Sequence, residues 1–273
     1  MKKLITFLLL ISISKIYSQS IGSYLSNFYK YDKNSNFIEI KEETKFYNKN
    51  GVKREIEYKT FNKYMDLISL KRFNSENKLI WLNIYKYDSL RRRIRLDNKH
   101  WINVIGYQKK HTTYEYDSIG NCLEIQFNSN NKILNITKYE FDTNRNLVQL
   151  ANYNGSGNLI GYEKAKYYVD ENTVEISQFN NKGKLIITQS HSIDYSKDFK
   201  HKTQYEYNEY GDLIFWERRL NENDNVCYTI EYKYDKRKNW ISKKKFSQIK
   251  TKNGKLKKKK IKMIKTREIK YGI

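Results

Sequence analysis

The sequence predicts an all-β fold, a repetitive array of antiparallel β-hairpins arranged as an elongated twisted sheet or a β-solenoid, after a cleaved N-terminal signal helix. Two observations predict it. A short motif recurs about every 27 residues, and the segments between its turns alternate apolar and polar side chains, as half-buried strands do. Helical periodicity is not sustained after the first 18 residues. Repeats of this kind bury their apolar faces mainly against their neighbours.

The first element is a segment with the layout of a secretory signal peptide, residues 1–18. Two lysines precede an apolar stretch from Leu4 to Ile13, and polar residues follow to Ser20. The apolar stretch is about half the ~20 residues that a membrane-spanning helix needs. We therefore expect cleavage at the end of this segment, no transmembrane span in the mature chain, and a periplasmic, outer-surface or secreted protein. Residues 19–273 are expected to form a single domain.

The repeating unit reads Tyr-x-Tyr-Asp-x-x-Gly-Asn-x-Leu and is best preserved from Tyr114 to Leu123. Variants begin at seven other positions: Tyr29, near Lys59, Tyr85, Tyr139, Tyr167, Tyr205 and Tyr232. A second turn pattern, Phe/Tyr-Asn-x-x-Gly/Asn-Lys/Asn-Leu/Ile, lies between these units, as from Phe179 to Leu185. Each period therefore contains two turns, which predicts one hairpin after another.

The turn residues support this prediction. Asp or Asn at the first turn position can accept hydrogen bonds from the backbone that follows, and a later Gly supplies positive φ. Only Gly120 and Gly211 keep that glycine among the eight Tyr-Asp turns. The other turns are expected to place a different residue there: Ser35, Met65, Arg92, Arg145, Thr173 and Lys238. Some of these turns are therefore expected to be strained or remodelled.

Aromatic residues are abundant, with 25 Tyr and 12 Phe. Because the Tyr positions recur at a fixed phase, we expect tyrosine to be the main core-forming residue, packed between neighbouring hairpins. The alternative is that aromatic side chains on a sheet face contact a ligand such as a sugar. The candidates for such contacts are Trp81, Trp101, Trp216 and Trp240.

Positive charge is concentrated at the C-terminal end. The formal net charge is +23, and residues 236–273 contain 17 Lys or Arg but one acid, Glu268. This segment could bind a polyanion such as an acidic polysaccharide, anionic lipid or nucleic acid. The candidate residues are Lys243, Lys244, Lys245, Lys257, Lys258, Lys259, Lys260 and Lys262. The alternative, which we favour, is that these lysines coat an exposed last hairpin and keep its open edge from pairing with other sheets. Export argues against a role with genomic DNA.

The sequence predicts no catalytic, cofactor-binding or metal-binding residue, so we expect a protein that is not an enzyme and has no cofactor. The four histidines form no metal-binding pattern and are expected on strands or the surface. Cys122 and Cys227 lie about four periods apart, too far for a disulfide in a linear array, and are expected to be free, partly buried thiols.

The repeats resemble the YD-repeat, or RHS-like, family. The Tyr-Asp pairs that carry the resemblance are Tyr31-Asp32, Tyr87-Asp88, Tyr116-Asp117 and Tyr234-Asp235. It covers most of residues 24–271, and the segment 232–271 looks like the end of short exported members from Bacteroidetes-type bacteria. The resemblance implies a non-catalytic binding or scaffold protein of the Gram-negative envelope or exterior. Its partner is not identified by the sequence, with an envelope protein or a polysaccharide as candidates. Eight units are too few to enclose a cargo as large members do, so that function is not carried over.

Overall fold

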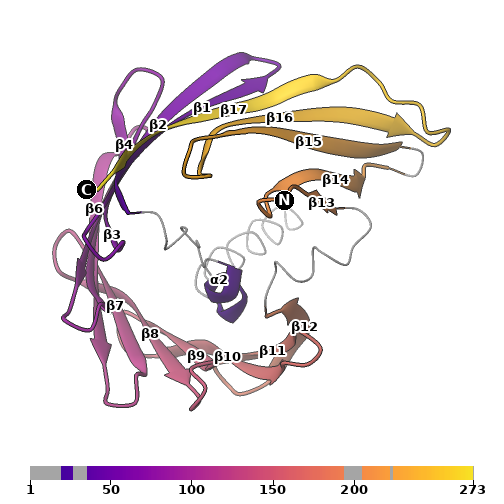
Figure 1. Ribbon diagram of the computed structural model, residues 1–273. Helices are drawn as coiled ribbons and strands as arrows, with labels where there is room; N and C mark the ends of the chain where they lie inside the picture. The colour runs from indigo at the N-terminus through magenta and orange to yellow at the C-terminus, as the bar shows by residue number, and fades with distance from the viewer. Residues whose placement is uncertain (1–19, 27–35, 194–204, 222–223, 273) are drawn as a thin grey trace, which may run out of the picture. The chain divides into compact units, whose positions relative to one another are not determined.

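The computed structural model describes residues 20–26, 36–193, 205–221 and 224–272. Within these ranges the chain forms seventeen β-strands and one short helix, α2 (Ile21–Ser26), as Figure 1 shows. The expected all-β fold of antiparallel hairpins is confirmed. The predicted signal peptide, residues 1–18, lies outside the described residues. No helix in the described ranges is long and apolar enough to cross a membrane.

The chain divides into two compact units. Unit 1 consists of Met1–Lys30, Tyr114–Gln126 and Lys132–Tyr195, and unit 2 of Tyr31–Thr113, Phe127–Asn131 and Ser196–Ile273. Cys122 is half-buried in unit 1, and Cys227 is buried in unit 2. Each unit is described by itself below.

Unit 2 contains two antiparallel meanders. The first is β1 (Phe37–Asn48), β2 (Gly51–Phe61), β3 (Leu67–Phe73), β4 (Leu79–Tyr87), β5 (Arg93–Ile102) and β6 (Gly106–Tyr116), of which the last three residues belong to unit 1. The second is β13 (Tyr205–Tyr207), β14 (Leu213–Arg219), β15 (Asp224–Tyr234), β16 (Trp240–Thr251) and β17 (Lys260–Tyr271). A small core of Phe37, Ile40 and Phe61 packs where the first strands meet.

The last strand of the chain joins the two meanders, because β17 pairs with β16 on one side and with β1 on the other. Figure 1 shows the yellow β17 between these two strands. The register with β1 runs from Phe37 opposite Tyr271 to Phe46 opposite Met263. The expectation that the lysine-rich end is an exposed hairpin with an open edge is therefore wrong. Both edges of β17 already carry hydrogen-bonded neighbours.

Charge complementarity accompanies this pairing of first and last strands. Glu42 of β1 is 2% exposed. Its carboxylate lies 2.6 Å from Arg267 and 3.1 Å from Lys265 of β17, and 3.0 Å from Lys59 of β2. Burial alone would raise the pKa of Glu42, but the three cations together lower it to about 2. One buried acid thus neutralises part of the basic C-terminal strand.

Unit 1 is a smaller meander with a helix packed on it. It holds most of β7 (Cys122–Asn128), then β8 (Ile133–Phe141), β9 (Leu147–Asn154), β10 (Leu159–Tyr168), β11 (Thr173–Asn180) and β12 (Leu185–Ser192). From β8 to β12 each strand pairs antiparallel with the next. Ile21 of α2 is fully buried against Leu147, Leu150, Val174 and Ile176. Its backbone N–H donates to the buried carboxylate of Glu163, at 2.7 Å.

The hairpin turns follow one pattern, seen clearly at Asn180. Its N–H donates to the carbonyl of Lys184, and the N–H of Gly183 donates back to the carbonyl of Asn180. The side-chain oxygen of Asn180 accepts the N–H groups of Lys182 and Lys184. Gly183 has a φ of 76° and the pairing shifts by one residue at this point. This is a type I turn followed by a left-handed residue in a bulge, the usual three-residue hairpin loop.

Non-glycine residues take the left-handed position in several of these turns. Positive φ is found at three of the predicted positions, Met65, Arg145 and Lys238. In two turns the prediction is wrong by one residue, because Arg91 and Asn172 are left-handed and not Arg92 and Thr173. Arg92 instead donates its N–H to the Asp88 side chain as the next strand begins. Ser35 lies outside the described residues.

Tyrosine joins the repeats, but it does not form the core as expected. No described tyrosine is among the buried residues, whose apolar members are aliphatic, Phe or Cys; Tyr139, Tyr167 and Tyr271 are partly buried and pack against the two core clusters. Tyrosine hydroxyls instead donate to the carbonyl of a leucine that begins a strand of the preceding repeat. The pairs are Tyr87 to Leu67 at 2.9 Å, Tyr167 to Leu147 at 3.0 Å and Tyr232 to Leu213 at 3.3 Å. Each hydroxyl reaches a carbonyl at the start of a strand while its ring packs beside the strands. The tyrosine side chains are therefore half-buried.

Candidate functional site: a cation-aromatic face

Strands β14 to β17 of unit 2 bring aromatic and basic side chains onto one face. Directly opposed residues of antiparallel strands share a face. Trp216 is opposite Tyr228, and Lys243 is opposite both Tyr232 of β15 and Lys265 of β17. A bulge in β16 leaves Trp240 opposite Tyr234 and so on this same face. We call the following set the cation-aromatic face: Trp216, Tyr228, Tyr232, Trp240, Lys243, Lys245, Lys265 and Arg267.

Cations lie over rings throughout this face. The rings of Trp216 and Tyr228 stack with centroids 4.7 Å apart, and the Lys245 ammonium lies 4.6 Å and 4.5 Å from those two centroids. The Lys243 ammonium lies 5.3 Å from the Tyr232 ring. Cation–π attraction stabilises such contacts by roughly 0.5–2 kcal/mol each, so the rings partly hold the ammonium groups in place.

The positive charge of the face exceeds its negative charge. Burial lowers the pKa of Lys243, and the nearby Lys265, Arg267 and Lys245 lower it further, while Asp212 opposes them. Burial also lowers the pKa of Lys245. Within the described residues neither lysine forms an ion pair with a carboxylate. Half-buried ammonium groups without a counter-ion are what an anionic ligand would stabilise.

The other predicted lysines lie elsewhere, except Lys260, which is opposite Ser247 and so shares the face of Lys245. Lys244 points to the opposite face of β16, and Lys262 sits at a bulge of β17. Lys257 and Lys258 are exposed between the two strands, while Lys260 begins β17 opposite Ser247. Lys259 pairs with Glu231 at 2.8 Å and lies over the Phe246 ring. The eight candidates therefore do not form one patch.

The tryptophans divide in the same way. Trp81 is opposite Arg72 of β3 and His100 of β5. Counting the opposed pairs across the strands places Trp81 on the same face of unit 2 as Glu42, Arg267 and Lys243. Trp101 is on the other face, packed edge-on against Tyr107 at 5.0 Å with Lys78 over its ring. Three of the four predicted aromatic contacts thus share a face.

Sequence reasoning missed four members of the cation-aromatic face, namely Tyr228, Tyr232, Lys265 and Arg267. A signal was present for two of them. Tyr228 and Tyr232 have the same parity along β15, and Lys243 and Lys245 have the same parity along β16. Only the strand register shows that these two sets meet, and local sequence does not specify that register once bulges occur.

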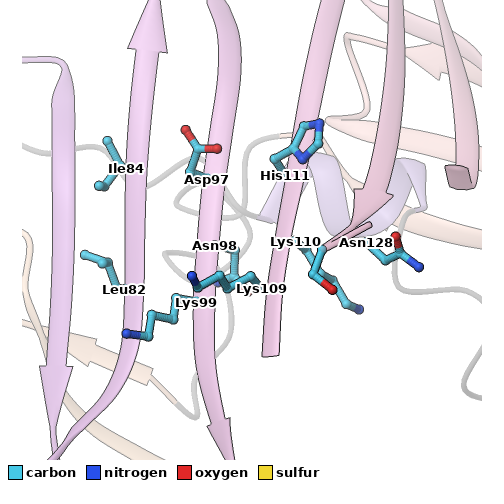
Figure 2. Close-up of a pocket in the computed structure, with 10 residues that line it drawn as sticks. Leu82, Ile84, Asp97, Asn98, Lys99, Lys109, Lys110, His111 and Asn128 are labelled. Atoms are coloured by element: carbon cyan, nitrogen blue, oxygen red, sulfur yellow. The ribbon is translucent and has the colours of Figure 1, made fainter. Parts of the chain in front are cut away.

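A separate hollow of about 250 Å³ lies over β4, β5 and β6 of unit 2. Figure 2 shows Leu82, Ile84, Asp97 and His111 along its wall. Asp97 is engaged by Arg95 at 2.7 Å. The His111 ring stacks on Phe127 with centroids 4.6 Å apart, and burial lowers the pKa of His111. With its carboxylate held by an arginine, this hollow offers mainly apolar and basic walls.

The remaining histidines fall in different places. His100 lies on β5, and His191 lines a polar pocket with Glu163 in unit 1. His201 lies outside the described residues. Among the described residues, no group of three or more His, Cys, Asp or Glu side chains comes close enough to hold a metal ion.

Comparisons with known proteins give distant likenesses. No family model matches the chain, and no curated protein matches it. Among solved structures, a porin-like protein from Bacteroides uniformis has a TM-score of 0.42 at 10% identity, covering 86% of this chain and 97% of that one. TcdB2-TccC3 has a TM-score of 0.36 at 12% identity, covering 77% of this chain and 14% of that one. The Tc holotoxin pore of Photorhabdus luminescens has a TM-score of 0.35 at 12% identity, with 78% and 14% covered. We draw no function from these values.

Proposed function

We propose that this protein is a non-catalytic binding protein of the cell envelope or exterior, and that it holds a polyanion on the cation-aromatic face. The observation that carries the proposal is the pair Lys243 and Lys245. Both are half-buried against aromatic rings, and neither has a carboxylate ion pair within the described residues. Removing an ammonium group from water is unfavourable unless an opposite charge compensates it.

The arrangement has a cost in stability that a bound anion would offset. Lys243 and Lys265 are directly opposed like charges, which destabilises an antiparallel pair. Glu42, the acid nearest to Lys265 and Arg267, is already shared with Lys59. Phosphate, sulfate or carboxylate groups spaced along a polymer would bridge Lys243 and Lys245, whose Cα atoms lie roughly 6–7 Å apart along a strand.

The test compares two double variants with the same change in net charge. Lys243→Gln with Lys245→Gln removes both ammonium groups of the face, and Lys257→Gln with Lys258→Gln removes two exposed ones. We expect the first variant to lose at least about tenfold in affinity for heparin at fixed salt, because two desolvated contacts are lost. The second should lose far less. Circular dichroism confirms that both variants keep their strands.

Equal losses in the two variants would show that net charge alone governs binding, and no loss in the first would refute the site.

The cellular location of the protein is a separate part of the proposal. It is tested by fractionating cells and sequencing the N-terminus of the recovered protein, which we expect in the periplasm or medium and shortened by about 18 residues, as signal-peptide removal requires.

A further inference from the structure

A chain of hydrogen bonds crosses β4 and β5 beside Trp81. Asn83 donates to the Tyr85 hydroxyl oxygen at 2.9 Å, and Asn98 donates to the side-chain oxygen of Asn83 at 2.6 Å. His100 Nδ1 lies 3.1 Å from the side-chain oxygen of Asn98. Asn83 is directly opposite Asn98, so these groups share a face. The chain orders four polar side chains in one row.

This row keeps hydrogen-bonding capacity for a ligand. Each amide nitrogen has a second N–H, and the Tyr85 hydroxyl has its own proton. Because Asn98 uses its N–H toward Asn83, its oxygen accepts the proton of His100 Nδ1. Burial lowers the pKa of His100, which favours the neutral ring. The Nε2 atom of His100 is then an acceptor. The row therefore offers amide N–H donors and an imidazole acceptor to a ligand, and a sugar hydroxyl can bind both because it donates and accepts.

Trp81 supplies the apolar surface beside this row. This residue is 37% exposed, and its ring centroid is 5.4 Å from that of His100. Its other neighbour across the sheet, Arg72, is engaged by Glu57 at 2.8 Å. A flat, partly exposed indole next to ordered amides can take the C–H face of a sugar ring while the amides bind its hydroxyls.

We propose that Trp81, Asn83, Asn98 and His100 form a sugar-binding subsite, and that the polyanion is therefore an acidic polysaccharide. This inference rests on the proposed function. The subsite and the cation-aromatic face lie on the same face of unit 2, with β17, β1, β2 and β3 between β16 and β4. At about 4.8 Å per step, the five steps from β16 to β4 span about 24 Å across the strands, so one polymer chain, and not a single sugar, engages both.

The experiment measures affinity for polygalacturonate, an acidic polysaccharide, and for inorganic polyphosphate, a polyanion without sugars. Trp81→Ala removes the indole of the subsite, and Trp101→Ala on the opposite face is the matched control. We expect Trp81→Ala to weaken polygalacturonate binding about tenfold and to leave polyphosphate binding unchanged. His100→Phe keeps a ring against Trp81 but removes the nitrogen acceptor, and it should act the same way even if the alanine variant does not fold. The double variant Lys243→Gln, Lys245→Gln should bind both polymers more weakly.

The outcomes separate the two proposals. If neither polymer binds the unaltered protein, the proposed function falls. If the lysine variant weakens both polymers while neither Trp81→Ala nor His100→Phe changes polygalacturonate binding, the sugar subsite is refuted and the polyanion function stands. The subsite is also refuted if Trp81→Ala and His100→Phe lower the affinity for both polymers equally. It is refuted as well if the unaltered protein binds polyphosphate but not polygalacturonate.

Discussion

Glu42 is the residue whose environment departs most from what its type suggests. A glutamate on the first strand of a basic protein would ordinarily be solvated, but here it is 2% exposed and contacts three cations. Replacing one partner of a buried ion cluster leaves the others uncompensated, which is more harmful than breaking a surface pair. Glu42 therefore holds the first and last strands together.

We predict that Glu42→Gln lowers the free energy of unfolding by about 3–5 kcal/mol at pH 7. Glu268→Gln breaks the exposed pair with Lys41 and should lower the free energy of unfolding far less, because water and salt screen an exposed pair. Urea titration followed by tryptophan fluorescence measures both variants. Similar small losses in the two would mean that Glu42 is solvated in solution.

Acid should weaken the same cluster. The folded pKa of Glu42, about 2, is below the unfolded value of roughly 4.3. Its contribution is therefore complete above the unfolded pKa and is lost as pH falls from about 4.5 to about 2, by about 3 kcal/mol in total. The difference in unfolding free energy between the unaltered protein and Glu42→Gln should shrink over that interval. A pH-independent difference would contradict the assignment.

At the scale of the hairpin, turns and tyrosine hydroxyls define the repeat. The Asx turn chemistry was predictable because it is local: Asp or Asn at the first position binds the backbone two to four residues on. The role of tyrosine was not, because its hydroxyl bonds a carbonyl 19 or 20 residues away in the preceding repeat. Periodicity alone could not distinguish a buried ring from one that links repeats through its hydroxyl.

Left-handed arginine in a turn is unfavourable. Arg145 has a φ of 63°, a region in which glycine is less strained. We predict that Arg145→Gly stabilises unit 1 by about 0.5–1 kcal/mol. Gly157→Ala, at φ 81° with open space for the added Cβ, should destabilise it by a similar amount through backbone strain. Thermal unfolding of both variants checks the signs. Destabilisation by Arg145→Gly, or stabilisation by Gly157→Ala, would show that the backbone at that turn is not left-handed.

The tyrosine link is tested at Tyr167. Tyr167→Phe removes the hydroxyl that donates to the Leu147 carbonyl, and we expect a loss of about 0.5–1.5 kcal/mol in unfolding free energy. Tyr64→Phe, at a residue that is 53% exposed, is the control and should change the unfolding free energy little. Equal unfolding midpoints in urea for Tyr167→Phe and the control would show that the hydrogen bond from the Tyr167 hydroxyl does not stabilise the protein.

For the whole molecule, the sequence predicted the fold class and most turns, but it did not predict that β1 pairs with β17. Strand alternation and turn residues are local features. The pairing of β1 with β17 joins residues more than 200 positions apart, and it brings the buried Glu42 to its basic partners Lys265 and Arg267. The sequence also predicted the basic residues as one set. It did not predict that some lie on the cation-aromatic face, one at a bulge and others in an exposed loop, because strand register decides this.

Backbone amide hydrogen exchange in β17 tests most directly whether the basic end is part of the sheet. Because residues 263–266 of this strand have hydrogen-bonded neighbours on both sides, their amides should exchange as slowly as those of β2, well below the rate of an unstructured peptide. Exchange in β17 at the unprotected rate, with β2 still protected, would contradict the pairing of the first and last strands and with it the cation-aromatic face.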